Sequence, residues 1–265
     1  MIRRFVSMID NAFLGASIQK WYGMRMASRM QALIEDGFDY RIVSHYQKNL
    51  SCDLSALCDL YGTDKGEIQK DGHPYSWPSH SYADFYSRHF DHCRNSVKNV
   101  FECGLGTNNP TLSSSMGISG KPGASLRVWR DYFQNATVYG ADIDQDVLFE
   151  EERIKTYYID QLDSASIERY WDQVGVKDFD LMIDDGLHTF NAGVTLFLGS
   201  VQRLANNGIY VIEDVHPDDL VRYKDFFRDK EFIVDYVNLF RPTTNLHDNS
   251  LVVVRKQNQL KNLSA

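Results

Sequence analysis

The chain has 265 residues, 43% of them hydrophobic, which suits one large α/β domain with an N-terminal extension. It carries 36 acidic and 28 basic residues, for a net charge of -8, and no run rich in Lys or Arg; this argues against nucleic acid as a partner. Its four cysteines show no CxxC pair and no paired zinc-ligand spacing, so we expect reduced thiols that pack in the core of a cytoplasmic protein.

The N-terminal segment begins with two arginines and an apolar stretch, which superficially resembles a signal peptide. Asp10 and Asn11 interrupt this stretch, and it falls short of the roughly 18 apolar residues that a bilayer span needs, so we predict no transmembrane segment. Residues 1–23 could instead form an amphipathic helix on a membrane surface or on a partner subunit. Between Gln19 and Asp36 a helix with one apolar face is predicted, which packs on the core or joins a homo-oligomer; its apolar residues are Met26, Met30, Leu33 and Ile34.

Residues 64–80 are rich in Gly, Pro, Ser and Asp, and they predict a loop that leads into the main domain. After Ser96, short apolar runs alternate with helical patterns. The runs are Val97–Cys103, Val138–Ala141, Thr156–Ile159, Phe179–Ile183, Ile209–Ile212, Phe232–Leu239 and Leu251–Val254. The helical patterns are Ser125–Phe133, Ser164–Val174, Phe190–Ala205 and Asp219–Arg228.

Most of these runs lack polar alternation, which is typical of parallel strands that are buried on both faces. We therefore predict a Rossmann-like, doubly wound α/β fold with a mostly parallel, seven-stranded sheet and an α-helical N-terminal extension. No helical pattern separates the last two runs, so they predict an antiparallel hairpin, and thus an antiparallel edge strand, at one side of the sheet. We place the sheet domain at residues 96–258, after an N-terminal part at 1–95 and before a tail at 259–265.

The first strand of this sheet ends in Glu102-Cys103-Gly104-Leu105-Gly106, where two glycines permit a tight turn against a ligand. The third glycine of a dinucleotide fingerprint is absent, because Asn109 stands at its position. Asp142 ends the next strand and could accept hydrogen bonds from both hydroxyls of a ribose. Asp160 and Gln161 follow the third strand and could read an adenine edge, although acids also end strands simply as turn formers.

The fourth and fifth strands end in acids, namely Asp184-Asp185 and Glu213-Asp214. Because neighbouring strands lie roughly 4.8 Å apart, these carboxylates can converge on one ion. An all-oxygen set of Asp185, Glu213 and Asp214 suits a hard cation such as Mg²⁺ better than zinc. His188 lies three residues after Asp185 and could act as a general base on a hydroxyl whose pKa the metal lowers. The alternatives are helix-capping acids and a structural histidine. His89, His92 and Cys93 match no ligand set.

Six segments, taken in this order, resemble class I S-adenosylmethionine-dependent sugar O-methyltransferases of the macrolide type, such as the mycinamicin O-methyltransferases. They are 102–106, 123–133, 140–144, 160–161, 184–188 and 212–214, and the resemblance covers roughly residues 57–215. One departure is Leu187, because these enzymes usually carry a serine before the histidine.

The resemblance implies that S-adenosylmethionine and Mg²⁺ are the cofactors and that the acceptor is a hydroxyl of a small molecule or sugar. It implies catalytic roles for Asp185 and His188, and a metal site at Asp185, Glu213 and Asp214. The implied cofactor-binding residues are Glu102, Gly104, Gly106, Ser125, Asp142, Asp160 and Gln161, covered from the N-terminal part by Thr63, Lys65 and Tyr82. The stretch at 107–122 is expected to be a mobile insertion.

Three other functions stay open at this point. A catechol-type methyltransferase would use the same ion with a flat aromatic acceptor. A nicotinamide-dependent oxidoreductase shares the fold but would want the missing third glycine. A non-catalytic protein could keep the cofactor pocket for regulation. The identity of the acceptor, the hydroxyl that is methylated, the pathway (capsule, lipopolysaccharide or antibiotic tailoring) and the oligomeric state do not follow from the sequence.

Overall fold

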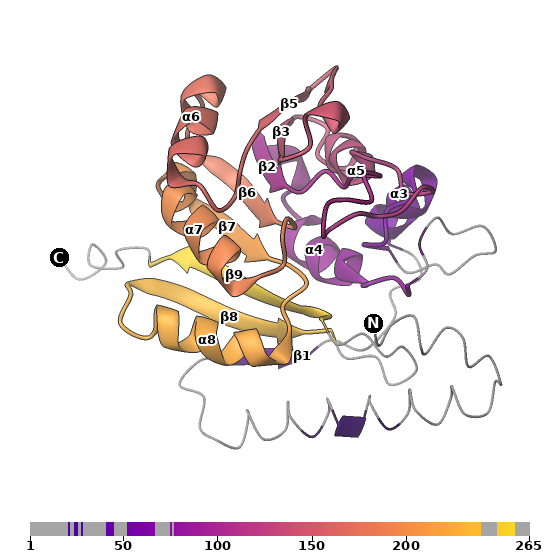
Figure 1. Ribbon diagram of the computed structural model, residues 1–265. Helices are drawn as coiled ribbons and strands as arrows, with labels where there is room; N and C mark the ends of the chain where they lie inside the picture. Colours follow the sequence, from indigo (N-terminus) through magenta and orange to yellow (C-terminus); the bar gives the residue numbers. More distant parts are fainter. Residues whose placement is uncertain are drawn as a thin grey trace.

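The structure is a computed structural model (Figure 1). It describes residues 52–66, 77–239 and 248–257, together with 41–44 and the single positions 21, 24, 25, 28 and 75. Trp21, Met24, Arg25 and Ser28 are helical, and the remaining residues of the helix predicted at 19–36, including all four apolar residues of its face, lie outside the described part. In the part of the chain that is described, no helix has both the length and the apolar character that crossing a bilayer would need.

The core of the molecule is one mixed sheet with the strand order β1-β8-β9-β7-β6-β2-β3-β5-β4. All seven predicted strands are present, and they are β2 (Asn99–Cys103), β3 (Thr137–Asp142), β5 (Ile154–Tyr158), β6 (Phe179–Asp184), β7 (Leu204–Ile212), β8 (Phe232–Asn238) and β9 (Ser250–Lys256). Strands β5, β3, β2, β6 and β7 run parallel to one another. The predicted doubly wound fold is thereby confirmed.

The predicted antiparallel hairpin is formed by β8 and β9, which pair along their whole length. Strand β9 also pairs antiparallel with β7, so it is inserted between β7 and β8. Two short strands extend the sheet beyond the seven predicted ones. β1 (Arg41–Ser44) pairs in parallel with β8, and β4 (Glu150–Glu151) pairs antiparallel with β5.

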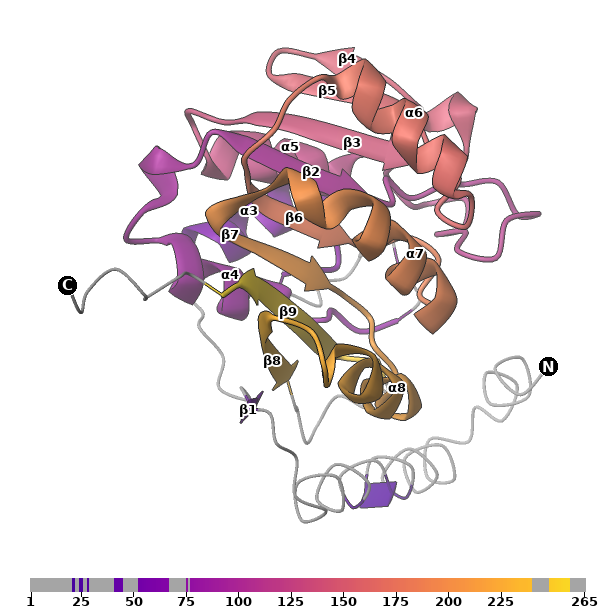
Figure 2. The same ribbon diagram turned by 90° about the vertical axis from the view of Figure 1, so that its left-hand side faces the viewer.

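The described helices cover both faces of the sheet (Figures 1 and 2). The first face is covered by α3 (Asp53–Tyr61), α4 (Tyr82–Phe90) and α5 (Ala124–Tyr132), and the second by α6 (Ser164–Val174), α7 (Phe190–Ser200) and α8 (Pro217–Phe227). Successive residues of the strands enter opposite cores: Val100 packs in the first hydrophobic cluster, whereas Phe101 packs in the second. This double burial explains why the strands read as continuous apolar runs.

Some predicted boundaries were wrong. The helix expected to reach Ala205 ends at Ser200, because a 3₁₀ turn, Val201–Arg203, redirects the chain and Leu204 already pairs with Phe179 in the sheet. Two other 3₁₀ turns lie at Arg94–Ser96 and Gln145–Val147. The stretch at 107–122 consists of turns with one isolated bridge.

Candidate active site

The sheet register places the predicted site residues at one edge. Cys103 pairs with Asp184 across β2 and β6, and Asp184 pairs with Ile212 across β6 and β7. The residues that follow these strand ends therefore emerge side by side at the carboxyl edge, where doubly wound folds bind ligands. The ends of β2 and β3 form one half of this edge, and the ends of β6 and β7 form the other.

Gly104 lets the chain leaving β2 pass directly against the chain leaving β6. It adopts a φ of +97°, and a Cβ there would lie 2.0 Å from the carbonyl oxygen of Asp185. The carboxylate of Asp142 fixes the same turn, because it accepts hydrogen bonds from the backbone N–H of Leu105 (2.8 Å) and of Asp144 (2.8 Å). Gly106 also adopts a positive φ, +80°. A Cβ at Gly106 would lie 2.3 Å from the side chain of Met116, so both glycines of this turn are sites of close approach.

Glu102 is the most deeply buried of the predicted cofactor residues, with no exposed surface. Its Oε2 accepts a hydrogen bond from Trp129 Nε1 (2.9 Å), whereas Oε1 has no hydrogen-bond partner among the described residues and lies 3.6 Å from the ammonium of Lys65. Burial raises the pKa of Glu102 to about 7, although the charge of Lys65 opposes the shift. Ser125, at the start of α5, is buried next to it and favours its charged form.

Asp160 and Gln161 make contacts with nearby loops. Asp160 Oδ1 accepts a hydrogen bond from the N–H of Leu162 (2.9 Å), as a turn former does. The buried amide of Gln161 donates to Asp184 Oδ1 (2.6 Å) and accepts from the N–H of Leu187 (2.9 Å). Gln161 therefore fixes the loop that carries the acids after β6, and its amide is already engaged there.

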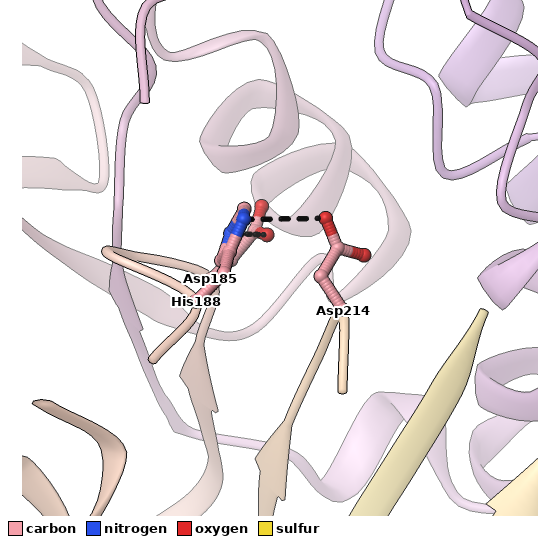
Figure 3. Close-up of side chains that lie close together, drawn as sticks. All are labelled: Asp185, His188 and Asp214. Atoms are coloured by element: carbon pink, nitrogen blue, oxygen red, sulfur yellow. Dashed lines mark hydrogen bonds and ion pairs between the residues drawn. The ribbon is translucent and has the colours of Figure 1, made fainter. Parts of the chain in front are cut away.

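Asp185, His188 and Asp214 converge beyond β6 and β7 (Figure 3). One ligand atom of each lies within 4.8 Å of the others, a spacing that could hold a metal ion. His188 Nε2 is 3.2 Å from Asp185 Oδ1, and its Nδ1 is 3.6 Å from Asp214 Oδ2. Burial disfavours the charged imidazole, but the two carboxylates outweigh burial and raise the pKa of His188 to about 10. His188 is therefore protonated at neutral pH in this arrangement.

Glu213, the third predicted metal ligand, is engaged elsewhere. Its Oε1 accepts a hydrogen bond from Tyr86 (2.6 Å), and its Oε2 forms a short ion pair with Lys65. Lys65 Nζ also lies 2.5 Å from Asp185 Oδ2. Burial lowers the pKa of Lys65, yet Asp185 and Glu213 together raise it well above its usual value, so this buried side chain is a fixed ammonium. Lys65 thus contacts the acids of the predicted metal site as well as Glu102.

Asp214 is held by the first residue of α4, Tyr82, and by His80 just before this helix. Tyr82 donates a hydrogen bond to Asp214 Oδ1 (2.5 Å) and accepts one from its N–H (3.1 Å). His80 lies between Asp64 and Asp214, with its Nδ1 3.3 Å from the former and its Nε2 3.5 Å from the latter. Burial opposes protonation of His80, but these acids raise its pKa well above the usual value. Thr63 is buried in the adjoining turn.

The sequence assigned Tyr82 to the cofactor and did not single out Tyr86, whereas in the structure both tyrosines contact these acids. Tyr82 and Tyr86 are four residues apart on α4, so they share one helix face and reach the consecutive residues Asp214 and Glu213. This spacing was a usable signal. The spacing of His80 and Asp64 in the sequence gave no such signal, because only the folded chain brings them to the strand ends.

The fold is similar to that of methyltransferases of known structure. No family model matches the chain. It is 33% identical over 162 residues to the 8-demethyl-8-alpha-L-rhamnosyl tetracenomycin-C 2'-O-methyltransferase of Streptomyces olivaceus, covering 61% of this chain and 37% of that protein. It is 34% identical over 165 residues to the mycinamicin VI 2''-O-methyltransferase of Micromonospora griseorubida, covering 62% and 36%. The chain thus spans little more than a third of the length of these curated relatives.

Among solved structures, the chain is similar to the MycE methyltransferase of the mycinamycin biosynthetic pathway, solved in complex with Mg, S-adenosylhomocysteine (SAH) and mycinamycin VI. The TM-score is 0.56 at 25% identity, covering 77% of this chain and 54% of that one. A crystal form of the same enzyme with Mg and SAH gives a TM-score of 0.55 at 26% identity. The resemblance to sugar O-methyltransferases that the sequence predicted is confirmed.

Proposed function

We propose that this chain is an S-adenosylmethionine-dependent O-methyltransferase that methylates a hydroxyl of a sugar or glycoconjugate, with Mg²⁺ as the ion and His188 as the base. The observation that carries the proposal is the convergence of Asp185, His188 and Asp214 beside the Gly104 turn. The named relatives, which act on rhamnosyl and macrolide glycosides, support a sugar acceptor over a catechol.

The residues present fit a hard divalent ion. Asp185 and Asp214 offer carboxylate oxygens within reach of one ion, and these are the ligand atoms that Mg²⁺ prefers. Glu213 would complete the set with an oxygen that now contacts Lys65. When bound, such an ion would lower the pKa of an acceptor hydroxyl.

The donor would lie over the turn at Gly104, and Asp142, at the end of β3, would accept hydrogen bonds from its ribose hydroxyls. When bound, the donor would supply a methyl group to the acceptor oxygen and leave as the neutral thioether, and His188 would take the hydroxyl proton. Because a sulfonium methyl is already activated, positioning supplies much of the rate enhancement. A base must be neutral, so His188 has to lose the proton that Asp185 and Asp214 now stabilise.

The test is transfer of labelled methyl groups by the purified chain to a panel of rhamnosides, macrolide glycosides and catechols. We expect transfer to a glycoside with Mg²⁺ and none after chelation; full activity in chelator would refute the role of the ion. Preference for a catechol would favour the aromatic alternative. Stabilisation by NAD but not by SAH would favour an oxidoreductase, and SAH binding without turnover on any acceptor would favour a regulatory protein.

The role of His188 needs a separate measurement. His188→Ala should retain SAH binding and lose turnover, because it removes the base without touching the donor turn. His92→Ala is the matched control, since His92 is an exposed histidine outside the site. Parallel loss of binding and turnover in His188→Ala would indicate a structural histidine instead. The expected homo-oligomer, a cytoplasmic location and the division of the chain at residues 95 and 258 stay predictions.

A further inference from the structure

Lys65 is the buried cation at the centre of the candidate site. Only 3% of its surface is exposed, and its ammonium lies against the carboxylates of Asp185 and Glu213. The backbone on either side is fixed, because Lys65 O accepts a hydrogen bond from the N–H of Ala83 (2.8 Å) and Asp64 O accepts one from the N–H of His80 (2.8 Å). The ammonium is therefore held at the acids by the fold and is not a chance contact of a flexible surface lysine.

Without this ammonium, buried carboxylates would face one another with no compensating charge. Burying unpaired charges is costly, so each acid would take up a proton or the acids would move apart. In the ion-free protein Lys65 thus compensates the charge of these carboxylates, as a divalent ion would do in the loaded protein. Both cations use Asp185, which belongs to the triad with His188 and Asp214.

Two cations that share Asp185 repel each other, because charges a few Å apart interact strongly where little water screens them. The structure provides a second partner for the ammonium: Glu102 Oε1 lies 3.6 Å from Lys65 Nζ, is fully buried and has no hydrogen-bond partner in the described part of the chain. A small rotation of the lysine side chain would bring the ammonium onto this oxygen. Lys65 would remain paired after giving up Asp185 and Glu213.

We propose that Lys65 is a positioning residue that acts as an internal cation of the site: it holds Asp185 and Glu213 together in the ion-free protein, competes with the divalent ion for them, and turns to Glu102 when the ion binds. The inference rests on the ion site of the proposed function. Its consequence is that the ion-binding carboxylates are preassembled, while the affinity for the ion is kept low enough for exchange.

The experiment measures Mn²⁺ binding to the purified full chain by electron paramagnetic resonance, with melting curves recorded with and without Mg²⁺. Lys65→Met and Lys65→Gln both remove the charge, and Lys65→Arg keeps it. Lys177→Met is the control, since Lys177 is exposed before β6, at the opposite edge of the sheet. Both neutral variants should melt below the wild type without an ion, yet bind Mn²⁺ about tenfold more tightly or better, and Mg²⁺ should raise their melting temperatures more.

Lys65→Arg and Lys177→Met should bind Mn²⁺ like the wild type. Unchanged or weaker Mn²⁺ binding in the neutral variants would overturn the inference, because a merely structural lysine lowers the melting temperature without tightening the site. If the neutral variants fold only with Mg²⁺ present, the inference is supported; if they fail to fold at saturating Mg²⁺, it is overturned. Tight Mn²⁺ binding by the neutral variants, with no methyl transfer by the wild type, would support the inference about Lys65 and count against the proposed reaction. A wild type that binds no Mn²⁺ would overturn both the inference and the proposed ion site.

Discussion

Replacing Gly104 with alanine tests whether the chains leaving β2 and β6 must touch for the site to form. The new Cβ would lie 2.0 Å from the carbonyl oxygen of Asp185 and 2.6 Å from its carbon, and both belong to backbone that cannot rotate away. The segment carrying Asp185 would therefore have to move by about 1.4 Å, from 2.0 Å to an ordinary contact of 3.4 Å. The alanine would also occupy a φ of +97°, which suits glycine.

The expected cost has two parts. Positive φ for a residue with a Cβ costs about 1 to 2 kcal/mol, and overpacking against rigid neighbours costs about 1 to 3 kcal/mol more. Together they amount to about 2 to 5 kcal/mol, or roughly 5 to 15 °C in melting temperature for a chain of this size. Gly175→Ala is the matched control, because Gly175 has a φ of +66° and nothing within 4 Å of its Cβ position, so only the first part applies.

Thermal unfolding and Mn²⁺ titration of the two variants give the readout. Gly104→Ala should lose markedly more stability than Gly175→Ala, and it should also lose Mn²⁺ affinity because Asp185 is displaced. Equal melting temperatures for the two variants would show that the loops separate at no cost, and the reasoning from close backbone approach would then be wrong.

Two further predictions concern stability. The folded-state pKa of Glu102, about 7, exceeds its usual value of 4.5, so its contribution to stability is fully present below pH 4.5 and is lost as the pH rises through 7. In denaturant titrations at several pH values, Glu102→Gln should abolish this loss, which amounts to at most about 3 kcal/mol of unfolding free energy. Parallel pH profiles for the wild type and the variant would contradict this prediction. The guanidinium of Arg153 donates hydrogen bonds to the carbonyls of Arg130, Phe133 and Ala136, so Arg153→Met should lower the unfolding free energy by about 2 kcal/mol. Arg169 is exposed, and Arg169→Met should change the unfolding free energy by less than about 0.5 kcal/mol. Similar values for the two variants would show that the three hydrogen bonds of Arg153 do not stabilise the fold.

The sheet could be predicted from the sequence because its strands are buried on both faces. Burial on two sides leaves continuous apolar runs, and seven of them matched seven strands. The two additional strands are short, and β4 has only the residues Glu150 and Glu151, which carry no apolar signal. Strand β7 begins earlier than predicted because Asn206 and Asn207 interrupt its apolar pattern while the backbone already belongs to the strand. The local hydrophobic pattern therefore predicted which strands exist better than it predicted where each strand begins and ends.

The site residues that directly follow strands could be predicted from the sequence. The residues that contact them from distant parts of the chain were harder to predict. Asp185 and Asp214 follow strands whose order fixes their proximity, so sequence reasoning could pair them. The position of Lys65 depends on a contact across 120 residues to Asp185 and across 148 to Glu213, and no periodicity encodes such contacts. For this reason sequence placed Lys65 over the cofactor, whereas the structure shows it at the acids.

Backbone conformation adds an independent argument that these strand ends serve a site. His188 and Asp214 both adopt a φ of +53°, in the left-handed region that residues with a Cβ adopt uncommonly, although Asp and His do so more often than most. Such strain persists only where surrounding contacts over-determine it, and Tyr82 does this for Asp214 by hydrogen bonding to both its side chain and its N–H. Glycine would relieve the strain at either position but would remove the imidazole or the carboxylate.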